Sequence, residues 1–293
     1  MKIKFVLYTL GAFLFLLGLT MLIPTACALF YGETDFPSFL ISVGITSGIG
    51  GALYWICRPG EGRTILTQRE GFLIVSAGWI FASLFGGLPY LIHGTLPTLT
   101  DAYFETISGF TTTGATVINK IETLPHGTLL WRSMTQWLGG MGIIILSVAL
   151  LPFLGVGGRQ LFKAEAPGPV KYKLEPRITE TARSLWAIYM IITIVGFIFL
   201  LFGGMGVFDA VNHIFCAMAT GGFSTKDTSI AWFNSAYIDG VLIAFMLIAG
   251  MNFTLHYKLL TGDFRTFYRD SEARFFLGTV LITTIFVAAD LRF

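Results

Sequence analysis

Six apolar segments, each about 20 residues long or longer, constrain the fold of this chain more than any other feature. A hydrophobic stretch of this length crosses the hydrocarbon core of a bilayer as an α-helix. Only 12% of the residues are charged, about half of the roughly 25% usual in soluble domains, so lipid must form part of the surroundings. We therefore predict an all-α polytopic membrane protein. The segments are residues 5–30, 37–57, 71–93, 129–153, 184–202 and 236–257, and a seventh begins near Phe275.

The first apolar segment resembles a secretory signal in two respects. Lys2 and Lys4 precede it, and the small residues 26–28 near its end could form a cleavage site. Its apolar stretch, however, is longer than the 7–15 residues usual for a signal core. A retained transmembrane helix is the favoured interpretation.

Neither metal chemistry nor catalysis is predicted from the reactive side chains. Cys27, Cys57 and Cys216 are far apart and lie in or beside apolar stretches, so neither a zinc site nor a disulfide framework is suggested. The four histidines share no ligand spacing, and paired catalytic acids and nucleophile motifs are missing. We therefore do not expect an enzyme.

The distribution of charge predicts the topology. If the N-terminus is cytoplasmic, 15 of the 19 Lys and Arg residues lie on the cytoplasmic side, which is the positive-inside pattern. This holds only if two shorter stretches, 101–116 and 209–224, enter from the outside and return to it. The outer side then holds nine acids against four bases, and their field would concentrate cations there.

The two re-entrant stretches repeat one another at an offset of 108 residues. Each begins with an acid suited to a helix N-terminus, continues through about ten mostly apolar or small residues, and ends in Thr and Gly. A membrane helix precedes each stretch, and a membrane helix containing Gly-Met follows it. The predicted unit is helix, short pore helix, Thr/Gly loop, helix. The aligned identities are Asp101/Asp209, Ala102/Ala210, Thr112/Thr220 and Gly114/Gly222.

Such a unit suits the conduction of a dehydrated monovalent cation. An extended backbone whose carbonyls face an axis replaces the hydration shell of K⁺, and glycine permits the backbone angles that this requires. Non-helical backbone at membrane depth persists only where it lines protein or a water-filled path. One such loop alone would be read as a turn between helices, but two matched loops favour a pore. A secondary transporter with broken helices is the alternative.

Three motifs carry a resemblance to a known family: FETISGFTTTGAT at 104–116, WRSMTQWLGGMG at 131–142 and ATGGFST at 219–225. With them the chain resembles the Trk/Ktr/HKT superfamily of potassium transporters, and within it the bacterial TrkH membrane subunits. The resemblance implies two N-terminal helices followed by four pore repeats around one selectivity filter. It also implies potassium uptake across the bacterial inner (plasma) membrane by a multi-pass protein with a cytoplasmic N-terminus. Whether ions move passively or by symport stays open.

Partners and ligands follow from the same resemblance. The lipid bilayer, a second copy in a homodimer and a cytoplasmic TrkA-like nucleotide-binding regulatory subunit are the implied partners. Potassium is the implied bound ion, and neither an organic cofactor nor nucleic acid is expected.

The resemblance also assigns the filter residues. Gly114 stands where a serine in plant relatives accompanies sodium preference, so glycine implies selectivity for potassium. Potassium is expected at Thr112, Thr113, Thr220 and Gly221. The first filter strand is Thr111, Thr112, Thr113, Gly114, Ala115 and Thr116, and the second is Thr220, Gly221, Gly222, Phe223 and Ser224.

The sequence departs from the family pattern because repeats three and four are missing. Two strands supply only half of a fourfold ring of carbonyls, so we expect either a truncated product, which is favoured, or a subunit that pairs with a second copy in a 2 + 2 pore. The expected division is two N-terminal helices (1–68), the first repeat (69–158), a cytoplasmic linker (159–182), the second repeat (183–262), and a linker with the start of a third repeat (263–293).

Several residues near the first filter strand allow two interpretations. Arg132 either pairs with Glu105 or Asp101 and braces the filter, or extends to the lipid headgroups. Glu105 should face protein or water because a carboxylate in lipid is costly. The glycine-rich stretch 139–142 either permits close helix packing or makes the inner helix flexible.

Overall fold

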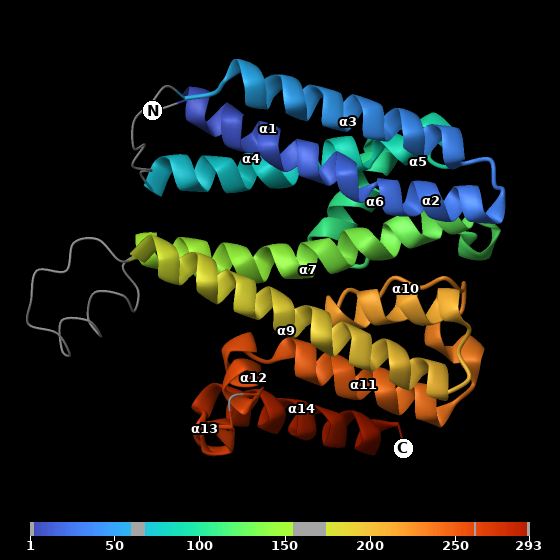
Figure 1. Ribbon diagram of the computed structural model, residues 1–293. Coiled ribbons are helices and arrows are strands. Elements are labelled where there is room, and N and C mark those ends of the chain that lie inside the picture. Colours follow the sequence, from blue (N-terminus) through green and yellow to red (C-terminus); the bar gives the residue numbers. More distant parts are fainter. Residues whose placement is uncertain (1–2, 60–67, 155–173, 261, 292–293) are drawn as a thin grey trace, which may run out of the picture.

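The computed structural model describes residues 3–59, 68–154, 174–260 and 262–291, and its regular elements are all helices. The long helices lie side by side, and successive ones run in opposite directions (Figure 1). Among the described residues, five helices are long and apolar enough to cross a membrane, or six if one bent pair forms a single span. The protein is a polytopic membrane protein, as predicted.

The N-terminal unit is a helical hairpin. Helices α1 (Ile3–Thr20) and α2 (Leu22–Tyr31) form one continuous span, and α3 (Phe36–Ile56) returns beside them. Glycine allows this close pairing: a Cβ on Gly50 would collide with the backbone of Phe15 in α1. Small residues at such a contact let two helix backbones approach within a membrane.

Each repeat contains a long helix, a short helix, a loop and a second long helix (Figure 1). The first repeat comprises α4 (Gln68–Gly86), α5 (Leu88–His93), α6 (Leu99–Phe110), the 3₁₀ helix η1 (Ile121–Thr123) and α7 (His126–Leu154). The second comprises α9 (Leu174–Phe202), α10 (Val207–Met218), η2 (Ser229–Phe233), α11 (Ala236–Gly250) and α12 (Phe253–Leu260).

The apolar segments coincide with these helices, with two differences. The predicted linker 159–182 lies partly outside the described residues, and α9 already begins within it at Leu174. The segment predicted at 236–257 is not one straight helix, because α11 and α12 meet at an angle of 100°. The side chain of Asn252 caps α12 by accepting from the Thr254 amide at 3.0 Å. Nε2 of His256 donates to the Ile248 carbonyl at 2.8 Å, so this bend has its own polar contacts.

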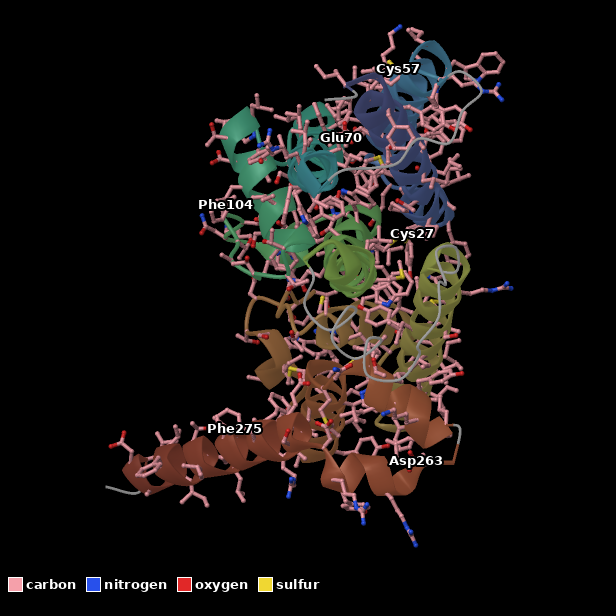
Figure 2. The ribbon with its side chains drawn as sticks, turned by 90° about the vertical axis from the view of Figure 1, so that its left-hand side faces the viewer. Cys27, Cys57, Glu70, Phe104, Asp263 and Phe275 are labelled. Atoms are coloured by element: carbon pink, nitrogen blue, oxygen red, sulfur yellow. The ribbon has the colours of Figure 1, made fainter. Side chains whose placement is uncertain are left out.

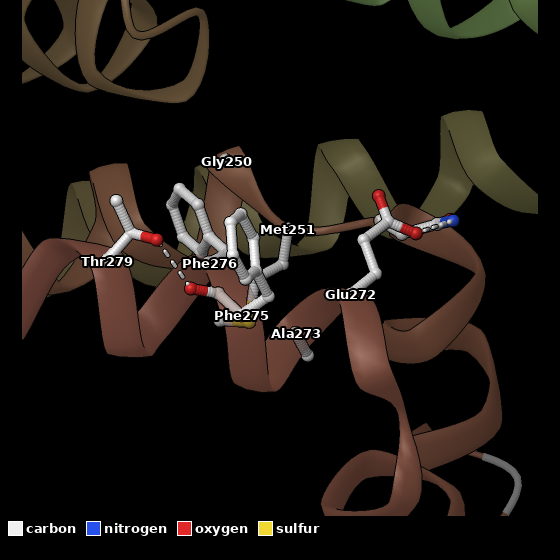
Figure 3. A pocket seen from close by; sticks show the side chains of 8 residues that line it. Gly250, Met251, Glu272, Ala273, Phe275, Phe276 and Thr279 are labelled. Carbon is white, nitrogen blue, oxygen red and sulfur yellow. Dashed lines mark hydrogen bonds between the residues drawn. The ribbon is translucent and has the colours of Figure 1, made fainter.

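The C-terminal helices lie at the edge of the molecule. After α13 (Phe264–Arg269), α14 (Ser271–Asp290) extends away from the other helices (Figure 2), and Ala273 is its one buried residue among those described. At the α11–α12 bend, Phe276 lies against Gly250, and Asn252 Nδ2 donates to Glu272 at 3.4 Å (Figure 3). Among the described residues, helix α14 therefore packs on the other helices through its first turns.

Two hydrophobic cores hold the described residues together. One lies within the second repeat and includes Tyr189, Ile214 and Phe245. The other joins the N-terminal hairpin to the first repeat and includes Phe39 and Trp131. Phe215 of α10 packs against both cores. The contact between α7 and α10 therefore sets the relative position of the two re-entrant stretches.

Candidate ion-conducting site

The two re-entrant stretches have the same structure as well as similar sequences. Helices α6 and α10 each contain 12 residues, and both their first and their last residues differ by the 108 positions of the sequence repeat. The amides of Thr112 and Thr220 donate to the carbonyl three residues earlier, at 2.9 and 3.0 Å. The next amide in each loop donates to the carbonyl five residues earlier at 2.9 Å. The same short turn therefore ends both helices.

The loops that follow share an unusual backbone. Thr112 and Thr220 have φ of 55° and 51°, and Gly114 and Gly222 have φ of 77° and 84°. A β-branched residue at positive φ is rare and costs energy, so its occurrence twice at matched positions indicates a required conformation. In each loop, two residues with left-handed backbone angles are separated by one residue. This conformation ends the preceding helix and turns the chain away from it.

Most carbonyls in these loops are free of protein hydrogen bonds. In the part of the chain that the structure describes, no donor reaches the carbonyls at 111–114 or 220–223. The carbonyls at the ends of the loops are occupied: Ser108 Oγ donates to Ala115 at 2.6 Å, and Arg132 donates to Ser224 at 3.2 Å. Carbonyls at membrane depth require a partner, and these carbonyls have none among the described residues.

A buried side chain of the short helix, α6 or α10, holds the far end of each loop. The carboxylate of Glu105 accepts from Thr116 Oγ1 at 2.9 Å and from the Val117 amide at 3.0 Å. At the equivalent position of the second repeat, His213 Nε2 lies 3.0 Å from Ser224 Oγ. Its Nδ1 faces the Asp209 carbonyl at 2.8 Å, and because a carbonyl only accepts, Nδ1 carries the proton and Nε2 accepts from Ser224. Two different residue types thus perform the same positioning.

Arg132 joins the two loops. It is 1% exposed, and its Nε donates to Glu105 at 2.9 Å, so Glu105 and not Asp101 is its acidic partner. The same guanidinium donates to the Ser224 carbonyl at 3.2 Å and lies 4.2 Å from the centre of the Phe223 ring. Arg132 therefore braces the two loops and does not extend to the headgroups, and Glu105 faces protein.

Helix α7 of the first repeat supports the loop of the second repeat. Gln136, one turn after Arg132, accepts from the Phe223 amide at 3.2 Å. One turn further, a Cβ on Gly140 would lie 3.1 Å from the Ala219 Cα, and a Cβ on Gly139 would collide with the Phe110 carbonyl. These two glycines thus allow close packing. Gln136 was missed by the sequence reasoning, although a polar residue four positions after Arg132 in an apolar helix is a usable signal.

The segments that follow the two loops are also bonded to each other. Asp227 accepts from the Ile121 amide at 2.6 Å, and Glu122 accepts from the Asp227 amide at 3.2 Å. Lys226 lies 3.5 Å from Asp209. Some of the acids counted as a cation-attracting field are therefore engaged in holding the two repeats side by side.

The pattern of the TrkH family, described as cation transport proteins, matches residues 36–291. This chain belongs to the TrkH family. The Trk system potassium uptake protein TrkH of Escherichia coli K12 is 45% identical over 271 residues, which are 92% of this chain and 56% of that protein. Trk system potassium uptake protein TrkG of the same organism is 39% identical over 96% of this chain and 59% of that protein.

A solved structure has the same fold. The crystal structure of the potassium transporter TrkH from Vibrio parahaemolyticus superimposes with a TM-score of 0.85 at 37% identity, over 97% of this chain and 58% of that one. The chain thus spans a little over half the length of these TrkH proteins. Its relatives are transport proteins and not enzymes.

Proposed function

We propose that the two loops are half of a potassium-selective filter. The single observation that carries this proposal is the repeated loop with left-handed residues at 112, 114, 220 and 222 and with unbonded carbonyls at 111–114 and 220–223. Carbonyls of Thr112, Thr113, Thr220 and Gly221 would replace water around the ion. The named activity of the TrkH and TrkG relatives, potassium uptake, supports potassium as the substrate.

The remainder of the ring must come from elsewhere. Two loops surround only part of an axis, so an ion there would keep some of its water and selectivity by dehydration would fail. Further loops of a longer polypeptide, or the two loops of a second copy, would complete the filter. With the N-terminus cytoplasmic, the inner membrane would hold this assembly, and the basic cytoplasmic segments would face a TrkA-like regulatory subunit.

The experiment is a chimaera in which residues 1–293 replace the corresponding part of the Vibrio parahaemolyticus protein. In it, Gly114→Ser should lower the K⁺/Na⁺ permeability ratio, because a Cβ at this left-handed position would collide with the Gly221 carbonyl. The matched control is Gly240→Ser in α11, where an added Cβ meets nothing within 4 Å. An unchanged permeability ratio for both Gly114→Ser and Gly222→Ser would remove the filter assignment.

A further inference from the structure

A groove of about 600 Å³ lies between α1, α4 and α7, on the side of α6 where Phe110 ends the helix. Its walls are almost entirely hydrocarbon and include Phe13, Leu16, Val75, Trp79 and Met141. The volume is in the range of ordinary ligand sites. Water in so apolar a space would lose hydrogen bonds, and an empty space would forfeit van der Waals contact. The groove therefore requires an apolar occupant.

The two hydroxyl groups that line the groove already donate their protons within α1. Thr9 Oγ1 donates to the Phe5 carbonyl at 3.0 Å, and Thr20 Oγ1 donates to the Leu17 carbonyl at 2.7 Å. The other lining residues are apolar or glycine. The lining thus has hydrocarbon character, while its position among the membrane-spanning helices places it beside lipid.

One end of the groove is directed toward the end of the helix bundle that carries basic residues. Thr9 and Ile74 line it, and they lie near the start of α1 and α4. At that end of the helix bundle, where the N-terminus also lies (Figure 1), Lys4, Arg58 and Arg69 are exposed. An anionic headgroup would be attracted there, with about 1 kcal/mol for each basic residue near a membrane surface.

We propose that this groove binds one acyl chain of an anionic phospholipid whose headgroup contacts Lys4, Arg58 and Arg69. The chain would reach Phe110, which lines the groove and is the last residue of pore helix α6 before the filter strand. A lipid would thereby support the end of the pore helix from behind. This inference rests on the groove and its charges and does not depend on the assignment of the filter.

The test uses the purified chain in phosphatidylcholine vesicles that contain increasing amounts of phosphatidylglycerol with brominated acyl chains. Bromine quenches a tryptophan that it contacts, and the contribution of Trp79 is obtained by comparison with Trp79→Phe. We expect Trp79 to be quenched at a several-fold lower proportion of brominated lipid than Trp186, which is 42% exposed on α9. Replacing Arg58 and Arg69 by Gln should weaken this preference about fivefold for each charge removed.

A matched pair of variants separates groove binding from general lipid contact. Gly78→Phe fills the groove, whereas Gly48→Phe places the same side chain on the exposed face of α3; an added Cβ meets nothing within 4 Å at either position. The preferential quenching should be lost in the first and kept in the second. Quenching of Trp79 in proportion to bulk lipid composition, equal quenching by brominated phosphatidylcholine, or no quenching would each overturn the proposal. Because the readout is fluorescence, none of these outcomes bears on ion selectivity.

Discussion

At the scale of single residues, the buried pair of Arg132 and Glu105 connects both re-entrant loops to α7. The ion pair is part of a network, because the Arg132 guanidinium also donates a hydrogen bond to the Ser224 carbonyl and packs on the Phe223 ring. Breaking one partner of a buried ion pair leaves an uncompensated charge, which costs far more than the net contribution of the pair. Lysine would keep the charge but could not donate in several fixed directions.

We therefore expect Arg132→Gln to lower the free energy of unfolding by roughly 3–5 kcal/mol. The double variant Glu105→Gln with Arg132→Gln should lose less than the single variant, because no unpaired charge stays buried. Thermal unfolding of the purified variants in detergent measures both effects. A double variant whose loss equals the sum of the losses of Arg132→Gln and Glu105→Gln alone would show that the two side chains are not coupled.

At the scale of elements, carboxylates from the α2–α3 loop cap the N-terminal end of α7. Asp35 Oδ2 accepts from the amide and hydroxyl of Thr128 at 2.9 and 3.0 Å, and Glu33 accepts from the His126 amide at 2.6 Å. Burial raises the pKa of Asp35 above its ordinary value of 3.8. The folded state therefore holds this proton more tightly than the unfolded state.

The stabilising contribution of protonated Asp35 is consequently full below about pH 3.8 and is lost as the pH rises through its raised pKa. Asp35→Asn resembles the protonated form, keeps an acceptor for Thr128, and should flatten this part of the stability–pH curve. Asp35→Ala removes the cap and should cost about 1 kcal/mol. Unfolding midpoints measured from pH 4 to 8 distinguish the two variants. Identical pH profiles for Asp35→Asn and the native chain would contradict the raised pKa of Asp35.

The bend between α11 and α12 is a second feature at this scale. The Ile248 carbonyl there has two donors, the Met251 amide at 3.2 Å and His256 Nε2 at 2.8 Å. His256→Leu should lower the free energy of unfolding by about 1 kcal/mol through loss of the second bond, and His256→Gln should restore part of it. Thermal unfolding measures the difference, and a fully stable His256→Leu variant would argue against a role in the bend.

At the scale of the whole molecule, the two loops should enter and leave the membrane on the outer side. Cysteines at Asn119 and Thr228, which are exposed just after the loops, should react with a membrane-impermeant maleimide in intact cells. A cysteine at Arg58 should react only after permeabilisation. The three native cysteines are first replaced so that only the introduced thiol is labelled. Labelling of position 58 from outside would invert the proposed topology.

The sequence by itself determined the membrane class, the helix–loop–helix repeat and the registers of Thr112 with Thr220 and Gly114 with Gly222, because apolar length, charge bias and glycine spacing are local properties of the chain. Only the tertiary structure decided that Arg132 pairs with Glu105, that Gln136 supports the second loop, and that the apolar segment 236–257 bends after Gly250. Those outcomes depend on which backbone amides and carbonyls are left without partners once the helices pack. A buried polar group must find its partner in space, and that partner can lie almost a hundred residues away, as Ser224 does from Arg132.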